Sequence, residues 1–180
     1  MRLKAILAGA GLTLAGVTAA AAQGVATYGD FIVRCVPDRG AVPCEMIQER
    51  GNPNTGQRLV ALSITFLAAE NRYILVVALP LGVALEKGVV IATNSFTTPT
   101  MPFRRCDQGG CYVEAAVDKP LIDAFMGASG EGKLQVFADG EEKPRELPLS
   151  FNGFSSAHND MVAKNRAARP AAPASAPAAP

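Results

Sequence analysis

Hydrophobic and polar positions alternate most regularly along residues 59–66, which read LVALSITF. Val60, Leu62, Ile64 and Phe66 fall on one face of an extended chain, because successive side chains of a strand point to opposite sides. The opposite face carries smaller and more polar side chains. This pattern predicts a strand with one face buried in a core.

Two other patterns place strands at the centre and at an edge of a sheet. Residues 73–79, YILVVAL, form a continuous hydrophobic run, which is typical of a central strand covered on both faces. Residues 89–92 predict a short strand that continues irregularly over residues 95–103. Pro99 and Pro102 confine this last piece to an edge, because proline cannot donate to the strand ladder. Such an edge could accept a partner strand.

The N-terminal part of the chain predicts a hairpin. Residues 28–36 alternate and are rich in β-branched and aromatic side chains, so we expect a strand there. Residues 37–43 predict a turn, and residues 44–50 predict the returning strand. The returning segment also fits a single helical turn, but Pro43 and the glycine-rich residues 51–56 favour the hairpin.

The C-terminal half combines a hairpin with two short helices. Residues 133–138 and 145–151 predict two strands joined through Asp139-Gly140. Asp118 is typical of a helix N-cap, and Pro120 would lie in the first turn. The hydrophobic residues that follow at helical spacing are Leu121, Ile122, Phe125 and Met126. A second short helix is expected over residues 153–165.

These elements together define a fold class. About eight short strands with closely spaced turns, and only two short helices, are typical of an all-β protein. We therefore expect a mainly antiparallel sandwich or barrel with one or two short helices and two disulfides.

The first 22 residues differ from the rest and predict a cleaved signal peptide, residues 1–22. Arg2 and Lys4 precede an uncharged stretch, residues 5–17, and residues 20–22 are small, as a signal peptidase requires. A membrane anchor is less favoured, because the hydrophobic run is short and no cluster of basic residues follows it.

The remainder predicts one β-rich domain, residues 23–165, and a disordered Ala/Pro-rich tail, residues 166–180. Later hydrophobic runs are interrupted by charged residues, proline and glycine, so we expect no integral membrane span after signal cleavage. The predicted location is the periplasm or the outer-envelope surface.

Charge argues against one class of partner. The chain has 17 basic and 16 acidic residues, and removing Arg2 and Lys4 with the signal leaves 15 against 16, a net charge of −1. Proteins that bind nucleic acid need a basic surface. We therefore expect no nucleic-acid partner.

Four cysteines lie in the exported part: Cys35, Cys44, Cys106 and Cys111. An even number in an oxidising compartment predicts two structural disulfides, and four cysteines allow three pairings. Local turns favour Cys35 with Cys44 and Cys106 with Cys111. The spacings do not match zinc knuckles or the Cys-x-x-Cys of thiol oxidoreductases, so we expect no metal and no other cofactor.

The segment from residue 104 to 117, RRCDQGGCYVEAAV, predicts a covalently closed loop between two ordered segments. Two adjacent glycines suit a tight turn, because they accept a positive φ without a Cβ clash. The residues of this loop form a candidate binding site: Arg104, Arg105, Asp107 and Gln108.

The sequence does not indicate an enzyme. His158 is the only histidine, and we expect it to be an exposed surface residue. A Ser-His-Asp arrangement with Ser155 or Ser156 and Asp160 is conceivable, but no Gly-x-Ser-x-Gly motif accompanies it. The prediction is a non-enzymatic binding protein; a periplasmic hydrolase with an unrecognised active site is the alternative.

Four segments together resemble the invasion-associated locus B family of alphaproteobacteria. They read GDFIVRC, PLGVALEKGV, RCDQGGCYVEA and LSFNGFSSAHNDM, and they span residues 29–162. Arg105-Cys106-Asp107 followed by Gly110-Cys111 is the most specific of these elements. The family often has tryptophan where this chain has Phe31.

The resemblance implies a small, β-rich protein of the periplasm or envelope. It implies a structural role for Cys106 and Cys111 and provides no catalytic residues. The expected partner is an unknown envelope or host protein, and the sequence does not indicate an oligomeric state.

Overall fold

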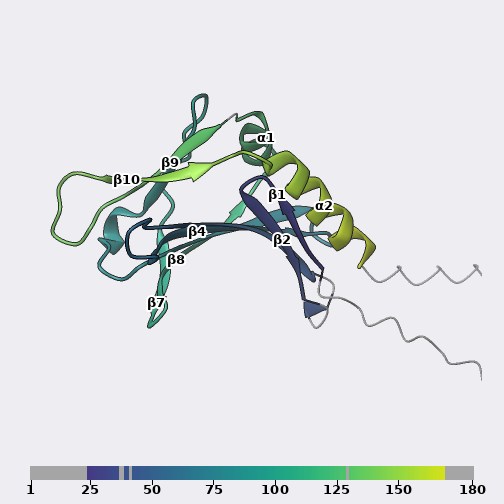
Figure 1. Ribbon diagram of the computed structural model, residues 1–180, viewed down its shortest axis with the longest axis horizontal. Helices are drawn as coiled ribbons and strands as arrows, with labels where there is room; N and C mark the ends of the chain where they lie inside the picture. The colour runs from purple at the N-terminus through teal and green to yellow at the C-terminus, as the bar shows by residue number, and fades with distance from the viewer. Residues whose placement is uncertain (1–23, 37–38, 41, 129, 169–180) are drawn as a thin grey trace, which may run out of the picture.

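The computed structural model describes residues 24–36, 39–40, 42–128 and 130–168. Two antiparallel sheets and two α-helices make up this part of the chain (Figure 1). The all-β class predicted from the sequence is confirmed, and the described strands form two separate sheets instead of a closed barrel. The predicted signal peptide, the residues from 169 onwards and part of the turn at residues 37–43 lie outside the described residues.

The larger sheet has seven strands in the order β1-β2-β3-β4-β5-β8-β7. They are β1 (Val25–Tyr28), β2 (Phe31–Cys35), β3 (Cys44–Gly51), β4 (Arg58–Leu67), β5 (Arg72–Leu79), β7 (Phe103–Asp107) and β8 (Gly110–Val117). Strands β1 to β5 are neighbours in both sequence and space, so they form a meander. Because β3 pairs antiparallel with β2, the predicted hairpin is confirmed over the alternative of a helical turn.

The central strands follow their sequence patterns closely. Val60, Leu62 and Ile64 of β4 have no solvent exposure, which confirms the inward face that the alternation predicts. Strand β5 lies between β4 and β8, as expected for a central strand. Its outer residues Ile74 and Val76 are only half-buried, so the second face of β5 is less covered than a continuous hydrophobic run suggests.

The predicted strand over residues 28–36 begins later than expected, and a separate strand precedes it. Residues 28–36 were expected to form one strand, but the chain turns between β1 and β2 at Gly29, where φ is +56°. A Cβ on Gly29 would lie 2.6 Å from the backbone oxygen of Asn152, so only glycine fits this position without displacement. Strand β1 therefore adds an edge strand that the sequence pattern did not predict.

The smaller sheet has three strands in the order β10-β9-β6. They are β6 (Val89–Ala92), β9 (Glu131–Val136) and β10 (Arg145–Ser150). In Figure 1, β9 and β10 lie above β4 and β8 of the larger sheet. The predicted edge segment folds back onto β6, with bridges between Val89 and Met101 and between Ala92 and Thr97.

Two helices complete the layer that covers the larger sheet: α1 (Lys119–Gly127) and α2 (Phe154–Ala167). A short 3₁₀ turn, η2 (Leu85–Lys87), precedes β6. Asp118 caps α1 as predicted, because its Oδ1 accepts a hydrogen bond from the Leu121 N–H at 3.2 Å. Helix α2 packs against β1 to β4 on the side of the sheet that faces β9 and β10 (Figure 1). No helix in the described ranges is long and hydrophobic enough to span a membrane.

Aromatic rings fill the core between these layers. The ring of Phe154 lies 5.4 Å from Phe31, 5.7 Å from Phe125 and 5.8 Å from Phe151, measured between centroids. These rings join β2, α1, α2 and the chain that follows β10. Phe31 thus fills a bulky core position, and at 1% exposure it is fully buried.

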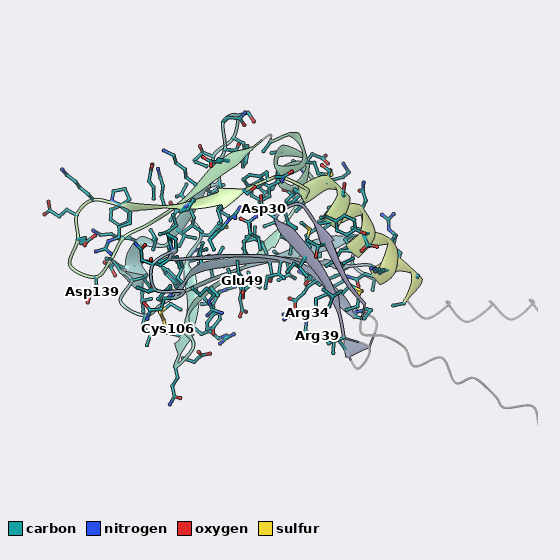
Figure 2. The ribbon with its side chains drawn as sticks, in the orientation of Figure 1. Asp30, Arg34, Arg39, Glu49, Cys106 and Asp139 are labelled. Carbon is teal, nitrogen blue, oxygen red and sulfur yellow. A yellow bond between two sulfur atoms is a disulfide. The ribbon has the colours of Figure 1, made fainter. Side chains whose placement is uncertain are left out.

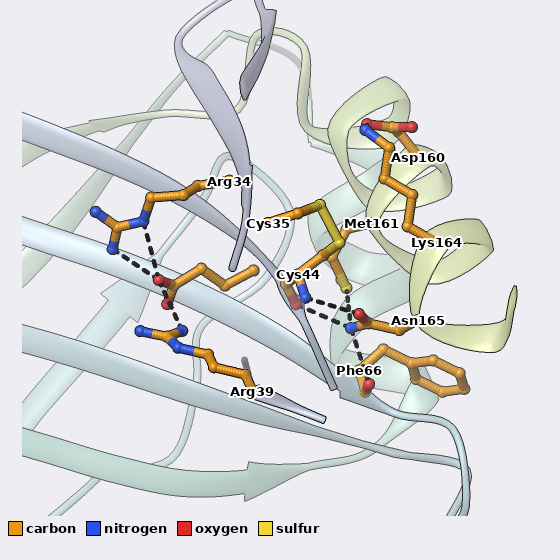
Figure 3. Close-up of a disulfide and its surroundings, with 10 residues drawn as sticks. Arg34, Cys35, Arg39, Cys44, Phe66, Asp160, Met161, Lys164 and Asn165 are labelled. Carbon is orange, nitrogen blue, oxygen red and sulfur yellow. Dashed lines mark hydrogen bonds and ion pairs between the residues drawn. A yellow bond between two sulfur atoms is a disulfide. The ribbon is translucent and has the colours of Figure 1, made fainter. Parts of the chain in front are cut away.

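Two buried amides hold the layers in register. The side chain of Gln48 on β3 donates to the backbone oxygen of Ser150 at 2.7 Å and accepts from the Ser150 N–H at 2.9 Å. Asn165 on α2 accepts from the Cys44 N–H at 2.9 Å and donates to the oxygens of Cys44 and Phe66 at 2.9 and 3.1 Å (Figure 3). Buried backbone groups lose their hydrogen bonds to water, and the two amide side chains supply hydrogen bonds in their place.

The disulfides are Cys35–Cys44 and Cys106–Cys111, with sequence separations of 9 and 5. The local pairing that the turns favour is therefore confirmed. Each bond joins two residues that lie directly opposite each other on neighbouring strands, β2 with β3 and β7 with β8.

Candidate functional site

The hairpin of β7 and β8 forms the stapled loop that the sequence predicts. Asp107 Oδ1 accepts a hydrogen bond from the Gly109 N–H at 2.7 Å, which fixes the turn between the two strands. Of the two glycines, Gly110 has the positive φ, +136°, and a Cβ there would lie 2.1 Å from the Leu79 backbone oxygen. The turn is thus fixed both by the disulfide and by its close approach to β5.

Arg105 in this loop is held by its neighbours. Its guanidinium lies 2.5 Å from Asp107 Oδ2 and 3.2 Å from Glu114 Oε1, and 4.0 Å from the centre of the Tyr112 ring. The hydrogen bond from the Gly109 N–H, followed by that from Arg105, lowers the pKa of Asp107 below its usual range. Arg105 and Asp107 therefore already contact each other, whereas the side chains of Arg104 and Gln108 are exposed.

The loop borders the face of the seven-stranded sheet that points away from the helices, which we call the open face. Directly opposite residues of antiparallel strands share a face, so the register of the sheet identifies its members. One row runs through Ile32, Ile47, Ser63, Val76 and Glu114. A second row runs through Thr65, Ile74 and Ala116.

Hydrophobic side chains occupy the middle of the open face. Ile32 is 42% exposed, and Ile47, Ile74 and Val76 are half-buried. No helix or strand of the described ranges covers this side of the sheet (Figure 1). Sequence reasoning missed this surface because it crosses five strands; the outward apolar positions of β2, β3 and β5 become neighbours only through strand register.

Charged groups border this apolar centre at both ends. Arg34 on β2 and Arg39, which lies between β2 and β3, are 2.7 and 3.1 Å from one carboxylate oxygen of Glu45 on β3 (Figure 3). Figure 2 shows both arginines on the side of the sheet opposite α2. At the β7–β8 end, the carboxylates of Asp107 and Glu114 both contact Arg105, and Arg58 donates to the Gly109 backbone oxygen at 3.1 Å. Ion-paired groups of both signs therefore border the open face at its two ends.

His158 is not the exposed residue that the sequence predicts. It lies on the inner side of α2 with 7% of its surface exposed, and its Nε2 is 2.9 Å from the Tyr73 hydroxyl. Its Nδ1 is 3.1 Å from Asn159 Oδ1, whereas Asp160 pairs with Lys164 at 2.7 Å. The conceivable Ser-His-Asp arrangement is therefore not formed. The expectation was wrong because α2 turns this position towards β5.

Burial lowers the pKa of His158 below its ordinary value of about 6.5, so the folded protein holds this imidazole neutral. Asn159 and Asp123 favour its charged form, whereas Lys119 and Arg166 oppose it. The unfolded chain binds the proton first as the pH falls below about 6.5. The free energy of unfolding should then decrease with falling pH.

We expect this decrease to disappear in His158→Gln, which keeps a polar partner for Tyr73 but cannot titrate. The slope for one such group reaches at most about 1.4 kcal/mol per pH unit. Urea denaturation of both proteins between pH 7.5 and 5.5 measures the two slopes, and contributions from other groups cancel in the comparison. Equal slopes would exclude His158 as the titrating group.

The described residues contain no cluster of three or more His, Cys, Asp or Glu side chains arranged to hold a metal ion. The four cysteines of the sequence are all consumed in the two disulfides.

Comparison with known proteins identifies the family of this chain. The family model described as Invasion associated locus B (IalB) protein matches residues 32–162. Two Brucella abortus proteins named Invasion protein B homolog, from strain 2308 and from biovar 1 strain 9-941, are each 25% identical to the chain. Each alignment spans 131 residues, 73% of this chain and 75% of the relative.

A solved structure shares the fold. The crystal structure of invasion associated protein b from Bartonella henselae superposes with a TM-score of 0.68 at 24% sequence identity. The superposition covers 79% of this chain and 98% of the Bartonella chain. The two chains therefore share the same overall fold.

Proposed function

Because the chain belongs to the invasion associated locus B (IalB) protein family, we propose that it is an exported, non-enzymatic protein that binds another protein at the cell envelope. Residues 1–22 would direct its export, and residues 23–165 would form the binding domain. The two disulfides support this location, because such bonds persist in oxidising compartments outside the cytoplasm.

The observation that carries the proposal is the open face. Exposed apolar area at the centre, surrounded by charged groups, is the usual composition of a protein-binding surface. Ile32 is the most exposed member of this centre. The stapled β7–β8 hairpin stands at one end of the open face and holds Arg105 and Asp107 in fixed positions.

The charges indicate the chemistry of the partner. A complementary surface would place an apolar patch opposite Ile32 and Val76, acidic groups opposite Arg34 and Arg39, and basic groups opposite the carboxylates of Asp107 and Glu114. The relatives are named for invasion, so a host surface protein is one candidate. An envelope protein of the producing cell is the other.

Two aspartate substitutions test the proposal. Ile32→Asp places a charge in the apolar centre, and we expect it to weaken binding at least about tenfold, since burying an isoleucine contributes roughly 1.5–3 kcal/mol. Leu85→Asp is the matched control, because Leu85 is 49% exposed but belongs to η2, outside the open face. The tagged proteins would be cross-linked to envelope fractions and, separately, to host-cell surface proteins.

The proposal predicts a protein that is captured by the wild type and by Leu85→Asp but not by Ile32→Asp. Circular dichroism would establish that both variants keep the fold. Equal capture by the two variants would show that the open face is not the binding surface. Capture by neither variant would indicate non-specific hydrophobic adhesion.

A further inference from the structure

An apolar groove of about 540 Å³ opens where strand β7 would otherwise continue alongside β8. The chain crosses from one sheet to the other at Pro102. Phe103, directly after it, pairs with Val113 of β8. Met101, directly before it, exchanges backbone hydrogen bonds with Val89 of β6 at 2.8 and 2.9 Å. The two sheets therefore separate at this corner and leave the groove between them.

The walls of the groove are apolar and held in place. The segment after β6 forms one wall, and the end of β8 with the start of α1 forms the other. The main apolar residues are Phe96, Pro99 and Met101 on the first wall and Val117, Pro120 and Leu121 on the second. Thr98 fixes the first wall, because its N–H donates to the Ile91 oxygen and its Oγ1 accepts from the Ile91 N–H, both at 2.9 Å. The groove is thus formed before any ligand arrives.

The β8 wall contains an unpaired strand edge. Strand β7 pairs with β8 only as far as Val113, and no strand of the described ranges pairs with the same edge from Glu114 to Val117. Proteins usually protect exposed edges with charged side chains and bulges. Strand β7, at the border of the same sheet, has both, since it reads FRRCD and its register shifts between Phe103 and Arg105. Residues 115–117 read AAV and have neither protection, so this edge is open to an added strand.

The register of the hairpin identifies the free backbone groups. Opposite residues of antiparallel strands alternate between hydrogen-bonded pairs, with Cα atoms about 5.5 Å apart, and closer pairs without such bonds. Cys106 and Cys111, at a Cα distance of 4.0 Å, are a pair of the second kind, so the backbone groups of Cys111 face β5. By alternation, the N–H and C=O of Ala116 face away from β5, towards the groove. Neither group has a partner among the described residues.

These free groups distinguish between classes of ligand. A purely apolar molecule would cover the N–H and C=O of Ala116 without pairing them, which is unfavourable. An extended peptide pairs both groups and directs alternate side chains into the groove. Ala115 and Val117 lie on the inner face of β8, because their partners on β5 are buried. Peptide residues opposite these two positions would therefore point between the apolar walls.

Charge complementarity fixes the direction of the peptide. Asp118 is the only charged residue among the described residues that line the groove, and its Oδ1 accepts from the Leu121 N–H at 3.2 Å. The neighbouring Lys119 is engaged by Asp123 at 2.6 Å. A peptide antiparallel to β8 has its N-terminal side at Asp118, so a basic residue at that end is complementary.

We propose that this groove binds an extended segment of another protein as an added strand, antiparallel to β8, with the sequence basic–hydrophobic–any–hydrophobic. The basic residue lies opposite Asp118, the hydrophobic residues lie opposite Val117 and Ala115, and the residue between them exchanges two hydrogen bonds with Ala116. Four residues span about 13 Å, the length of the free edge. The peptide side chains enter on the inner side of the sheet, so this site is separate from the apolar centre of the open face around Ile32.

A synthetic peptide tests this with the full-length protein. The probe is acetyl-Lys-Val-Thr-Val followed by a Gly-Gly spacer and fluorescein, and fluorescence anisotropy measures its affinity. Ala116→Pro removes the N–H that faces the groove and leaves the ladder with β5, so we expect about tenfold weaker binding. Ala116→Thr changes the same side chain but keeps the N–H. It is the matched control and should bind as the wild type does.

A second peptide makes the test independent of the folding of Ala116→Pro. Proline in place of the central threonine removes the N–H that would donate to the Ala116 oxygen, so wild-type protein should bind this peptide about tenfold more weakly. Hydrogen exchange of the Ala116 amide gives a direct readout. It should slow about tenfold when about nine molecules in ten carry the threonine peptide.

A charge variant tests the orientation. Asp118→Asn keeps the helix cap, since asparagine caps as well as aspartate, but removes the charge. We expect the lysine peptide to bind about two- to fivefold more weakly, the size of an exposed ion pair. A peptide with glutamine in place of lysine should bind both proteins equally. Ile32→Asp should leave the affinity unchanged, which separates this site from the open face.

Three results would overturn the proposal. The first is an anisotropy that stays unchanged at millimolar protein. The second is equal affinity for the threonine and proline peptides, because the backbone of β8 would then not pair with the ligand. The third is protection of the Ala116 amide that rises with protein concentration when no peptide is present, since a second copy of the chain would then occupy the edge.

Discussion

Reduction of both disulfides is expected to lower the free energy of unfolding by about 5 kcal/mol, the sum of about 2.7 and about 2.2 kcal/mol in the chain-entropy model. The separations of 9 and 5 residues close loops of 10 and 6 residues when both cysteines are counted. A domain of this size has a stability of about 5–15 kcal/mol, so the loss should be large. Urea denaturation with and without a thiol reductant measures it.

Paired substitutions separate the two bonds. Cys106→Ala with Cys111→Ala should lose only about 2.7 kcal/mol on further reduction, because the Cys35–Cys44 bond alone remains. Cys35→Ala with Cys44→Ala should lose about 2.2 kcal/mol of unfolding free energy on reduction, because the Cys106–Cys111 bond alone remains. A protein whose urea midpoint is unchanged by the reductant would contradict the structural role of these bonds.

Asn165→Ala should destabilise the domain by about 3 kcal/mol. The side chain has no solvent exposure and makes three hydrogen bonds to backbone groups of Cys44 and Phe66. Its removal leaves those buried groups unpaired, at a cost of about 1–3 kcal/mol each, reduced where water enters the space. Chemical denaturation at pH 7.5 gives the difference directly.

The neighbouring Lys164→Ala is the appropriate control. Lys164 pairs with Asp160 at 2.7 Å on the partly exposed side of α2, and such pairs contribute less than about 1 kcal/mol. If both variants lost the same free energy, the loss in Asn165→Ala would not come from its contacts with β3 and β4.

Periodic patterns predicted the parts of this fold that depend on local sequence. The alternation of β4, the position of β5 and the cap of α1 at Asp118 are local properties, and the structure has all three. The disulfide pairing followed from turns that return the chain locally. In each case the residues that decide the structure lie within a few positions of one another.

The predictions that failed depend on contacts between distant segments. Gly29 breaks a good strand pattern because its backbone meets Asn152, more than a hundred residues away. His158 is buried because α2 rotates it towards Tyr73, which no property of the helix sequence alone determines. The open face emerges only from the register of several strands. The stapled hairpin was thus predicted from the sequence, whereas its role as a binding site stays a prediction and the broader open face was missed.

Helix α2 has a further consequence for how the chain matures. It covers the inner side of β1 to β4, yet its Asn165 lies 121 residues after Cys44. Ribosomes make the N-terminal strands first, so the meander can pair locally while its hydrophobic side still lacks this cover. Folding is therefore completed only after the last turn of α2 is synthesised. Before that moment, the nascent chain exposes the hydrophobic side of β1 to β4, a surface that favours aggregation.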